Sequence, residues 1–252
     1  MELREESLPA LGADEVLVET ICSAISAGTE MLVYRGQFPH LIDLHDNLSS
    51  NLNYPFTYGY ACVGRIKEAG TNVDKSLLDK LVFGFQPHTS HFIAQPSSLL
   101  FAPASPTGTV SLPAETCSFL PNMETAVNLV QDAAPILGER VVVLGQGAVG
   151  LLVTSLLKEF PLESLVTSDR YELRRKASLA IGASESFDPE FISNKINSAD
   201  TNTMHQSAYA QSFDLTFELS GSPSALNDAI ALTTFSGRIV VGSWYGEKKS
   251  TD

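Results

Sequence analysis

The pattern of apolar and polar positions changes near residue 115. Before this point, short apolar runs such as 15–20 and 61–66 alternate with turn-rich stretches that contain several prolines. The periodicity between these prolines is too weak for a bundle of helices. This pattern predicts an antiparallel β domain, in which the polar segment 40–53 is an exposed excursion.

After residue 115, apolar runs alternate with longer segments of helical periodicity. Strands are predicted at 141–144, 165–168, near 185–187, at 214–219 and at 238–241. Helices are predicted at 123–134, 148–158, 172–181 and 224–233, and the polar stretch 194–212 is the least structured. Strands that alternate with helices of this length are typical of a parallel α/β sheet, here with about five strands.

A glycine-rich hexapeptide follows the first of these strands. Its sequence, Gly145-Gln146-Gly147-Ala148-Val149-Gly150, matches G-x-G-x-x-G and leads directly into an apolar helix. In this motif the first glycine allows a tight turn, the second lets the backbone approach a pyrophosphate, and the third permits close helix–sheet packing. The helix N-terminus adds N–H donors and partial positive charge. The sequence therefore predicts a dinucleotide-binding turn.

The second strand ends at Asp169, where a carboxylate would accept hydrogen bonds from the adenosine ribose of NAD. A carboxylate at this position favours NAD because it repels a 2′-phosphate. Arg170, Arg174 and Arg175 follow closely and could offset that repulsion, so NADP stays an alternative. The arginines could equally form a solvated helix face.

Together with two motifs of the first half, Ile25–Glu30 and Tyr58–Gly64, this arrangement resembles the medium-chain dehydrogenase/reductase superfamily of zinc-type alcohol dehydrogenases. Further segments resemble its bacteriochlorophyllide hydroxyethyl dehydrogenase-like branch: 26–30, 33–36, 122–126 and 243–246. The resemblance implies a GroES-like catalytic domain over residues 1–114 and a Rossmann domain over 115–252. It also implies a C-terminally truncated relative, because the sixth strand and the returning segment of the family would lie beyond residue 252.

The three positions of the family's catalytic zinc ligands depart from the family pattern. By the resemblance they fall on Ala27, on Tyr60 and at or next to Pro121, and Ala61 replaces an acidic neighbour. A catalytic zinc needs about three N, O or S ligands. We therefore expect no metal. The alternative, a site at His88 and His91, would lack a nearby acid or thiol.

Without zinc, another group must donate a hydrogen bond to the reacting oxygen. The resemblance places Thr29 where zinc members begin a proton relay, and Tyr60 brings a phenol to a former ligand position. We take both as the catalytic candidates. The alternatives are that Tyr60 fills the space of the metal and that Thr29 caps a turn. Tyr34 and His91 are weaker candidates.

By the same resemblance, further cofactor contacts are Thr125 near the nicotinamide and Arg174 near the ribose. Ser220, Gly242 and Ser243 lie at the carboxyl ends of the fourth and fifth predicted strands, where open α/β sheets bind ligands. As an alternative, the segment 220–223 is an ordinary strand-to-helix turn with an N-cap.

Composition and net charge indicate which classes of binding partner are disfavoured. Sixteen Lys and Arg face 29 Asp and Glu, so the formal charge of −13 disfavours nucleic acid and anionic membrane surfaces. The first residues lack the basic start and apolar run of a signal peptide, and no apolar window reaches a membrane span. We expect a cytoplasmic protein with a small-molecule substrate. A homo-oligomer is an open alternative, although the dimer segment that the resemblance implies lies outside the sequence.

The sequence thus predicts an NAD(P)-dependent, zinc-independent oxidoreductase that acts on an alcohol/carbonyl pair. The alternative is a nucleotide-binding relative without turnover that acts by binding or association. A purely structural interaction protein is a third interpretation. Substrate identity does not follow from the residues.

Overall fold

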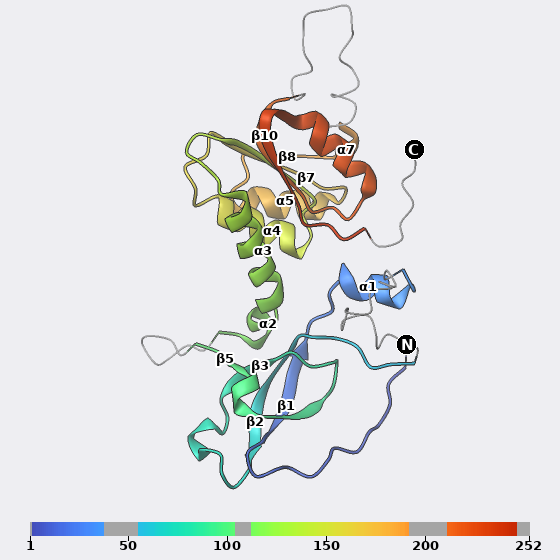
Figure 1. Cartoon of the computed structure of the whole chain (residues 1–252), viewed down its shortest axis with the longest axis vertical. Coiled ribbons are helices and arrows are strands. Elements are labelled where there is room, and N and C mark those ends of the chain that lie inside the picture. Colours follow the sequence, from blue (N-terminus) through green and yellow to red (C-terminus); the bar gives the residue numbers. More distant parts are fainter. Residues whose placement is uncertain (1, 38–54, 104–111, 192–210, 246–252) are drawn as a thin grey trace, which may run out of the picture. The chain divides into compact units, whose positions relative to one another are not determined.

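The computed structural model describes residues 2–37, 55–103, 112–191 and 211–245. The chain forms two compact units that divide between Pro121 and Asn122 and are described separately (Figure 1). The predicted excursion at 40–53 lies outside the described residues, as does nearly all of the polar stretch 194–212.

The first unit is built on an antiparallel sheet with the strand order β4-β1-β2-β3-β5. Its strands are β1 (Val16–Ser23), β2 (Cys62–Ala69), β3 (Leu81–Gly84), β4 (His91–Ala94) and β5 (Leu100–Phe101). Helices α1 (Thr29–Tyr34) and α2 (Ala114–Cys117) and two short 3-10 turns, at 75–77 and 96–98, complete it. This architecture confirms the antiparallel β domain that the turn-rich pattern predicts.

The second unit is built on a five-stranded parallel sheet with the order β10-β9-β6-β7-β8. Its strands are β6 (Arg140–Leu144), β7 (Ser164–Ser168), β8 (Glu185–Phe187), β9 (Phe213–Glu218) and β10 (Thr233–Val241). Its helices are α3 (Leu120–Ala133), α4 (Ala148–Leu157), α5 (Glu172–Ile181) and α7 (Pro223–Leu232). The predicted parallel α/β sheet is confirmed.

The start of β10 differs from the prediction, which placed this strand at 238–241. The strand begins directly after α7, at Thr233, which pairs with Phe213, and its register shifts before Arg238. The residues between look like a loop because Ser236 has a positive φ of 61° and Phe235 is exposed. The buried hydroxyl of Thr233 lies 2.7 Å from that of Thr216 and ties the early part of the strand to β9.

Both faces of the parallel sheet are covered, which explains why β6 is an unbroken apolar run. Val141 and Val143 pack against α3 and α4, whereas Val142 and Leu144 pack on the side covered by α7. A strand buried on both faces gains from an apolar side chain at every position. This core holds the carboxyl ends of β6, β7 and β9 at one edge of the sheet.

An ion pair joins β6 to β9 at the opposite edge. The guanidinium of Arg140 donates from Nε and Nη2 to the two carboxylate oxygens of Asp214, both at 3.0 Å. The backbone N–H of Arg140 also donates to Asp214 Oδ2 at 2.9 Å. These hydrogen bonds hold the pKa of Asp214 below its ordinary value.

We predict that Asp214→Asn lowers the free energy of unfolding by about 1 kcal/mol at neutral pH, because a bidentate, partly buried pair is lost. A lowered pKa means that the carboxylate stabilises the fold above about pH 4, its ordinary range, and that this contribution is lost as the pH falls through the lowered value. Urea unfolding at pH 7 and pH 3 measures both effects.

The matched control is Glu159→Gln, since Glu159 is exposed and lies 3.7 Å from its partner Lys158. It should leave the urea midpoint unchanged at either pH. If the free energies of unfolding of wild type and Asp214→Asn differ as much at pH 3 as at pH 7, the stabilising role of the Asp214 carboxylate is contradicted.

Candidate functional site

The glycine-rich hexapeptide forms an elbow at the carboxyl end of β6, between β7 and β9. The Gly145 N–H donates to Ser168 O at 2.7 Å, and the Leu219 N–H donates to Leu144 O at 2.8 Å. The strand order reverses here, because β7 lies on one side of β6 and β9, the next long strand, on the other. Open α/β sheets bind ligands at such a switch point.

Each glycine of the elbow has a separate structural reason. Gly145 has a φ of +95°, and a Cβ there would lie 2.6 Å from the Ser220 Cα. A Cβ on Gly150 would lie 2.0 Å from Gly145 O, so the start of α4 packs directly on the turn. Around Gly147, the N-cap of α4, no atom of the described residues lies within 4 Å of the Cβ position. The space above Gly147 is therefore open.

The side chain of Gln146 supports the elbow from beneath, a role that the sequence did not suggest. It is fully buried and donates from Nε2 to Gly145 O at 3.1 Å. The Thr154 hydroxyl of α4 donates to Gln146 Oε1 at 3.0 Å. A glutamine inside a glycine-rich turn gives no signal of this role, because the contact depends on a threonine two turns along the next helix.

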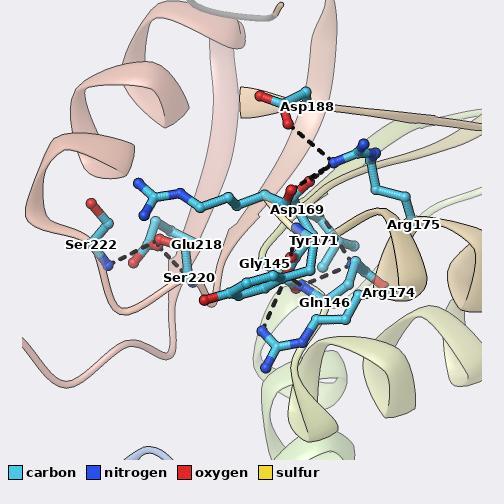
Figure 2. A network of polar contacts seen from close by, with 12 residues as sticks. Gly145, Gln146, Asp169, Tyr171, Arg174, Arg175, Asp188, Glu218, Ser220 and Ser222 are labelled. Atoms are coloured by element: carbon cyan, nitrogen blue, oxygen red, sulfur yellow. Dashed lines mark hydrogen bonds and ion pairs between the residues drawn. The ribbon is translucent and has the colours of Figure 1, made fainter. Parts of the chain in front are cut away.

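Asp169 lies beside the elbow and is only 6% exposed (Figure 2). Its Oδ2 accepts the Gln146 N–H and its Oδ1 accepts the Tyr171 N–H, both at 2.8 Å. The structure thus brings Asp169 to the turn, as the sequence spacing indicates. It also shows that the carboxylate holds the turn, with the second lone pair of each oxygen left for a further donor.

The three arginines after Asp169 differ in their contacts. Arg174 Nη1 lies 3.6 Å from Asp169 Oδ2, and its guanidinium lies 4.8 Å from the centre of the Tyr171 ring. Arg175 Nη1 is engaged by the protein itself, because it donates to Asp169 O at 2.7 Å and pairs with Asp188 at 3.1 Å (Figure 2). Arg170 is exposed. Only Arg174 and Arg170 therefore remain as candidates for a phosphate.

A second buried carboxylate, Glu218, ends β9 on the other side of the elbow (Figure 2). The Ser220 N–H donates to its Oε1 at 2.9 Å, and the Ser220 hydroxyl donates to the same oxygen. The Tyr245 hydroxyl donates to the other oxygen, Oε2. Burial and this carboxylate raise the pKa of Tyr245. Sequence reasoning found Ser220 but missed Glu218, since it reads as an ordinary strand residue.

The remaining predicted cofactor residues follow β9 and β10 or lie on α3 and α4. The Gly221 N–H donates to Ser243 Oγ at 2.8 Å, which joins the ends of these two strands. A Cβ on Gly242 would lie 2.9 Å from Leu129 of α3. Thr125 is exposed one helical turn before Leu129, and Ala148 is exposed at the start of α4, whereas Val149 packs toward the core.

In the first unit, Thr29 begins α1 and Tyr60 precedes β2. The Tyr60 side chain is half-buried and packs against an apolar cluster that includes Val63 and Phe83. Burial raises the pKa of the neighbouring Tyr58, with smaller contributions from Tyr60 and Glu30. The catalytic roles of Thr29 and Tyr60 stay predictions.

The first unit also holds a polar contact that the sequence did not predict. His88 Nε2 lies 2.7 Å from Glu30 Oε2, and His88 Nδ1 lies 2.9 Å from Ser23 Oγ. His91, by contrast, contacts its neighbour Ser90. Across the described ranges, no three His, Cys, Asp or Glu side chains gather in a group that could hold a metal ion.

Solved structures share this architecture. A protein described as a zinc-binding dehydrogenase from Sinorhizobium meliloti 1021, bound to NADP, aligns with a TM-score of 0.73 and 18% identity over 99% of this chain and 75% of its own. The 2R,3R-butanediol dehydrogenase of Bacillus subtilis aligns with a TM-score of 0.70 and 19% identity over 99% and 75%. The chain therefore shares the fold of these dehydrogenases, a GroES-like domain followed by a Rossmann domain.

Curated proteins with similar sequences share about a quarter of their residues with this chain. The L-threonine 3-dehydrogenase of Pyrococcus abyssi is 24% identical over all of this chain and 74% of its own length. Its namesake from Xanthomonas campestris pv. campestris is 23% identical over 95% of this chain and 72% of its own. No family model matches the chain. Within the described residues, no helix has the length and apolar character needed to span a membrane.

We predict that Gly150→Ala lowers the free energy of unfolding by about 1–3 kcal/mol, because its methyl group cannot fit against Gly145 O without moving the helix. Gly147→Ala is the matched control, since its Cβ meets open space and should leave stability unchanged. Thermal unfolding of the two variants without ligand measures the difference. Equal melting temperatures would contradict the close packing of α4 on the elbow.

Proposed function

We propose that this chain is an NAD(P)-dependent oxidoreductase that interconverts an alcohol and a carbonyl without a catalytic zinc. The observation that carries the proposal is the open space at Gly147, at the N-terminus of α4 and beside Asp169. The solved structures with this fold include an NADP complex and, from Escherichia coli CFT073, a short chain alcohol dehydrogenase with NADH (TM-score 0.68, 16% identity). The curated relatives are dehydrogenases by name.

The elbow fits a dinucleotide. Backbone N–H groups at the start of α4 would hold the diphosphate, since a helix N-terminus favours anions and Gly147 leaves room for close approach. Asp169 would accept a hydrogen bond from the ribose through a free lone pair. The nicotinamide, when bound, supplies or accepts the hydride.

The zinc-free part of the proposal rests on the residues at the family's ligand positions. Ala27 offers no ligand atom, the Tyr60 side chain packs against apolar neighbours, and Ala61 lacks the carboxylate of the family's acidic neighbour. In place of a Lewis acid, Thr29 and Tyr60 are proposed to donate hydrogen bonds to the substrate oxygen. Metal analysis of the purified protein tests this part, and stoichiometric zinc would overturn it.

The second candidate is a nucleotide-binding relative without turnover. It shares the elbow and predicts cofactor binding, but it predicts no consumption of NADH. Carbonyl substrates for the assay can be chosen from the relatives' names: 2-amino-3-oxobutanoate, acetoin and benzaldehyde are the oxidised partners of L-threonine, butanediol and benzyl alcohol.

We predict that millimolar NADH raises the melting temperature of the wild type, because a ligand that binds only the folded state stabilises it. Gly147→Ala should weaken NADH binding at least about tenfold, a loss of about 1.4 kcal/mol, because its methyl group occupies the space for the diphosphate. Thermal unfolding with and without NADH checks the first prediction, and titration calorimetry checks the second. If the variant binds NADH as tightly as the wild type, the dinucleotide lies elsewhere.

We predict that NADH binds more tightly than NADPH, since the buried Asp169 carboxylate would repel a 2′-phosphate. Asp169→Asn should remove this preference by weakening NADH binding, whereas Arg174→Gln should weaken NADPH binding more than NADH binding. The dissociation constants of both dinucleotides for the three proteins decide the question. If NADPH binds more tightly than NADH and Arg174→Gln abolishes that difference, the cofactor preference is the reverse of the one predicted.

A further inference from the structure

Three side chains from separate segments of the first unit form a continuous hydrogen-bonded chain. Ser23 ends β1, Glu30 lies in α1, and His88 follows β3. The imidazole lies between the other two, with its Nδ1 at 2.9 Å from Ser23 Oγ and its Nε2 at 2.7 Å from Glu30 Oε2. This series of hydrogen bonds runs from the buried carboxylate of Glu30 to the exposed hydroxyl of Ser23.

Glu30, the buried end of this series of hydrogen bonds, is held in a fixed position. The Glu30 side chain is only 9% exposed, and its second oxygen, Oε1, accepts the Ser26 N–H at 2.8 Å. A carboxylate that accepts hydrogen bonds from a backbone amide and an imidazole is compensated for its burial. Glu30 therefore has both oxygens engaged and is fixed in one orientation.

The imidazole is fixed from its backbone side. The His88 N–H donates to Tyr58 O at 3.1 Å, and the ring packs on Gly59, where a Cβ would lie 2.8 Å from His88 Cδ2. Gly59 has a φ of +124°, so this close approach needs glycine. The Cys62 thiol donates to Pro87 O at 3.1 Å and holds the residue before His88.

These contacts determine which nitrogen carries the proton. A Glu30 carboxylate accepts only, so His88 Nε2 must donate to it, and in the neutral ring Nδ1 is then an acceptor for the Ser23 hydroxyl. The pKa values of the neighbouring Tyr58 and Cys62 are raised by burial, so both stay neutral at pH 7. The arrangement is that of an acid, a base and a hydroxyl, in which the acid orients the base.

We propose that Ser23, His88 and Glu30 form a proton relay that serves the substrate oxygen, an inference that rests on the proposed function. In alcohol oxidation, the substrate hydroxyl gives its proton to Ser23 Oγ as the Ser23 proton passes to His88 Nδ1. The nicotinamide, when bound, would supply the acceptor for the carbon-bound hydrogen as hydride. Glu30 stabilises the imidazolium, which then releases the proton to water, and carbonyl reduction follows the same path in reverse.

The experiment combines kinetics with a spectroscopic readout. NADH oxidation is measured with acetoin and benzaldehyde for the wild type, His88→Ala, Ser23→Ala and Glu30→Gln. The control is His91→Ala, a histidine whose ring lies 3.1 Å from the exposed Ser90 hydroxyl. Ser23 is exposed, so its variant is expected to fold even if the others do not. Nitrogen-15 NMR of the histidine side chains reports the tautomer of His88.

We expect turnover by His88→Ala to fall by at least about 100-fold, with partial rescue by added imidazole, while His91→Ala keeps wild-type turnover. Ser23→Ala should lose turnover but keep the NADH-induced rise in melting temperature. The NMR spectrum should show His88 protonated at Nε2, and Glu30→Gln should change this state.

Wild-type turnover by His88→Ala or by Ser23→Ala overturns the relay and leaves the proposed function intact, and so does a His88 ring protonated at Nδ1 alone. A wild type that binds NADH but reduces neither carbonyl overturns the relay as a catalytic device and favours the relative without turnover. Failure of NADH to raise the melting temperature of the wild type instead overturns the proposed function itself.

Discussion

The close approach of three backbone segments at the edge of the parallel sheet is the constraint on which the proposed site depends. The turn after β6 touches the segments that follow β7 and β9, and α4 packs on the same turn. Side chains at Gly145 and Gly150 would separate these segments, whereas Gly147 leaves a space that none of the described residues fills. An apolar core on both faces of the sheet holds the segments at this distance.

Buried carboxylates fix the polar geometry around the proposed sites in both units. Asp169 and Glu218 flank the elbow, and Glu30 lies under His88 in the first unit. Each accepts at least one backbone N–H, so the cost of burying the charge is offset by hydrogen bonds that also fix a loop. The same residues therefore serve stability and position the groups that we assign to cofactor binding and proton transfer.

The sequence predicted the elements of the second unit well because each depends on local periodicity, and α5 has the predicted bounds. It also predicted Asp169, since the strand–turn–helix–strand spacing brings that residue to the elbow. It missed the contact of Glu30 with His88, which joins residues 58 positions apart and has no periodic signal. The start of β10 was missed for a related reason, because a register shift makes its first residues resemble a loop.

The central claim is that the diphosphate of a dinucleotide binds at the N-terminus of α4. Backbone amide NMR during a titration with NADH tests it most directly, because each N–H reports its own environment. The account predicts that the resonances of Gly147 and Ala148 move most and saturate with the ligand, together with those near Asp169. Saturable shifts confined to other parts of the chain, with the α4 amides unmoved, would contradict it.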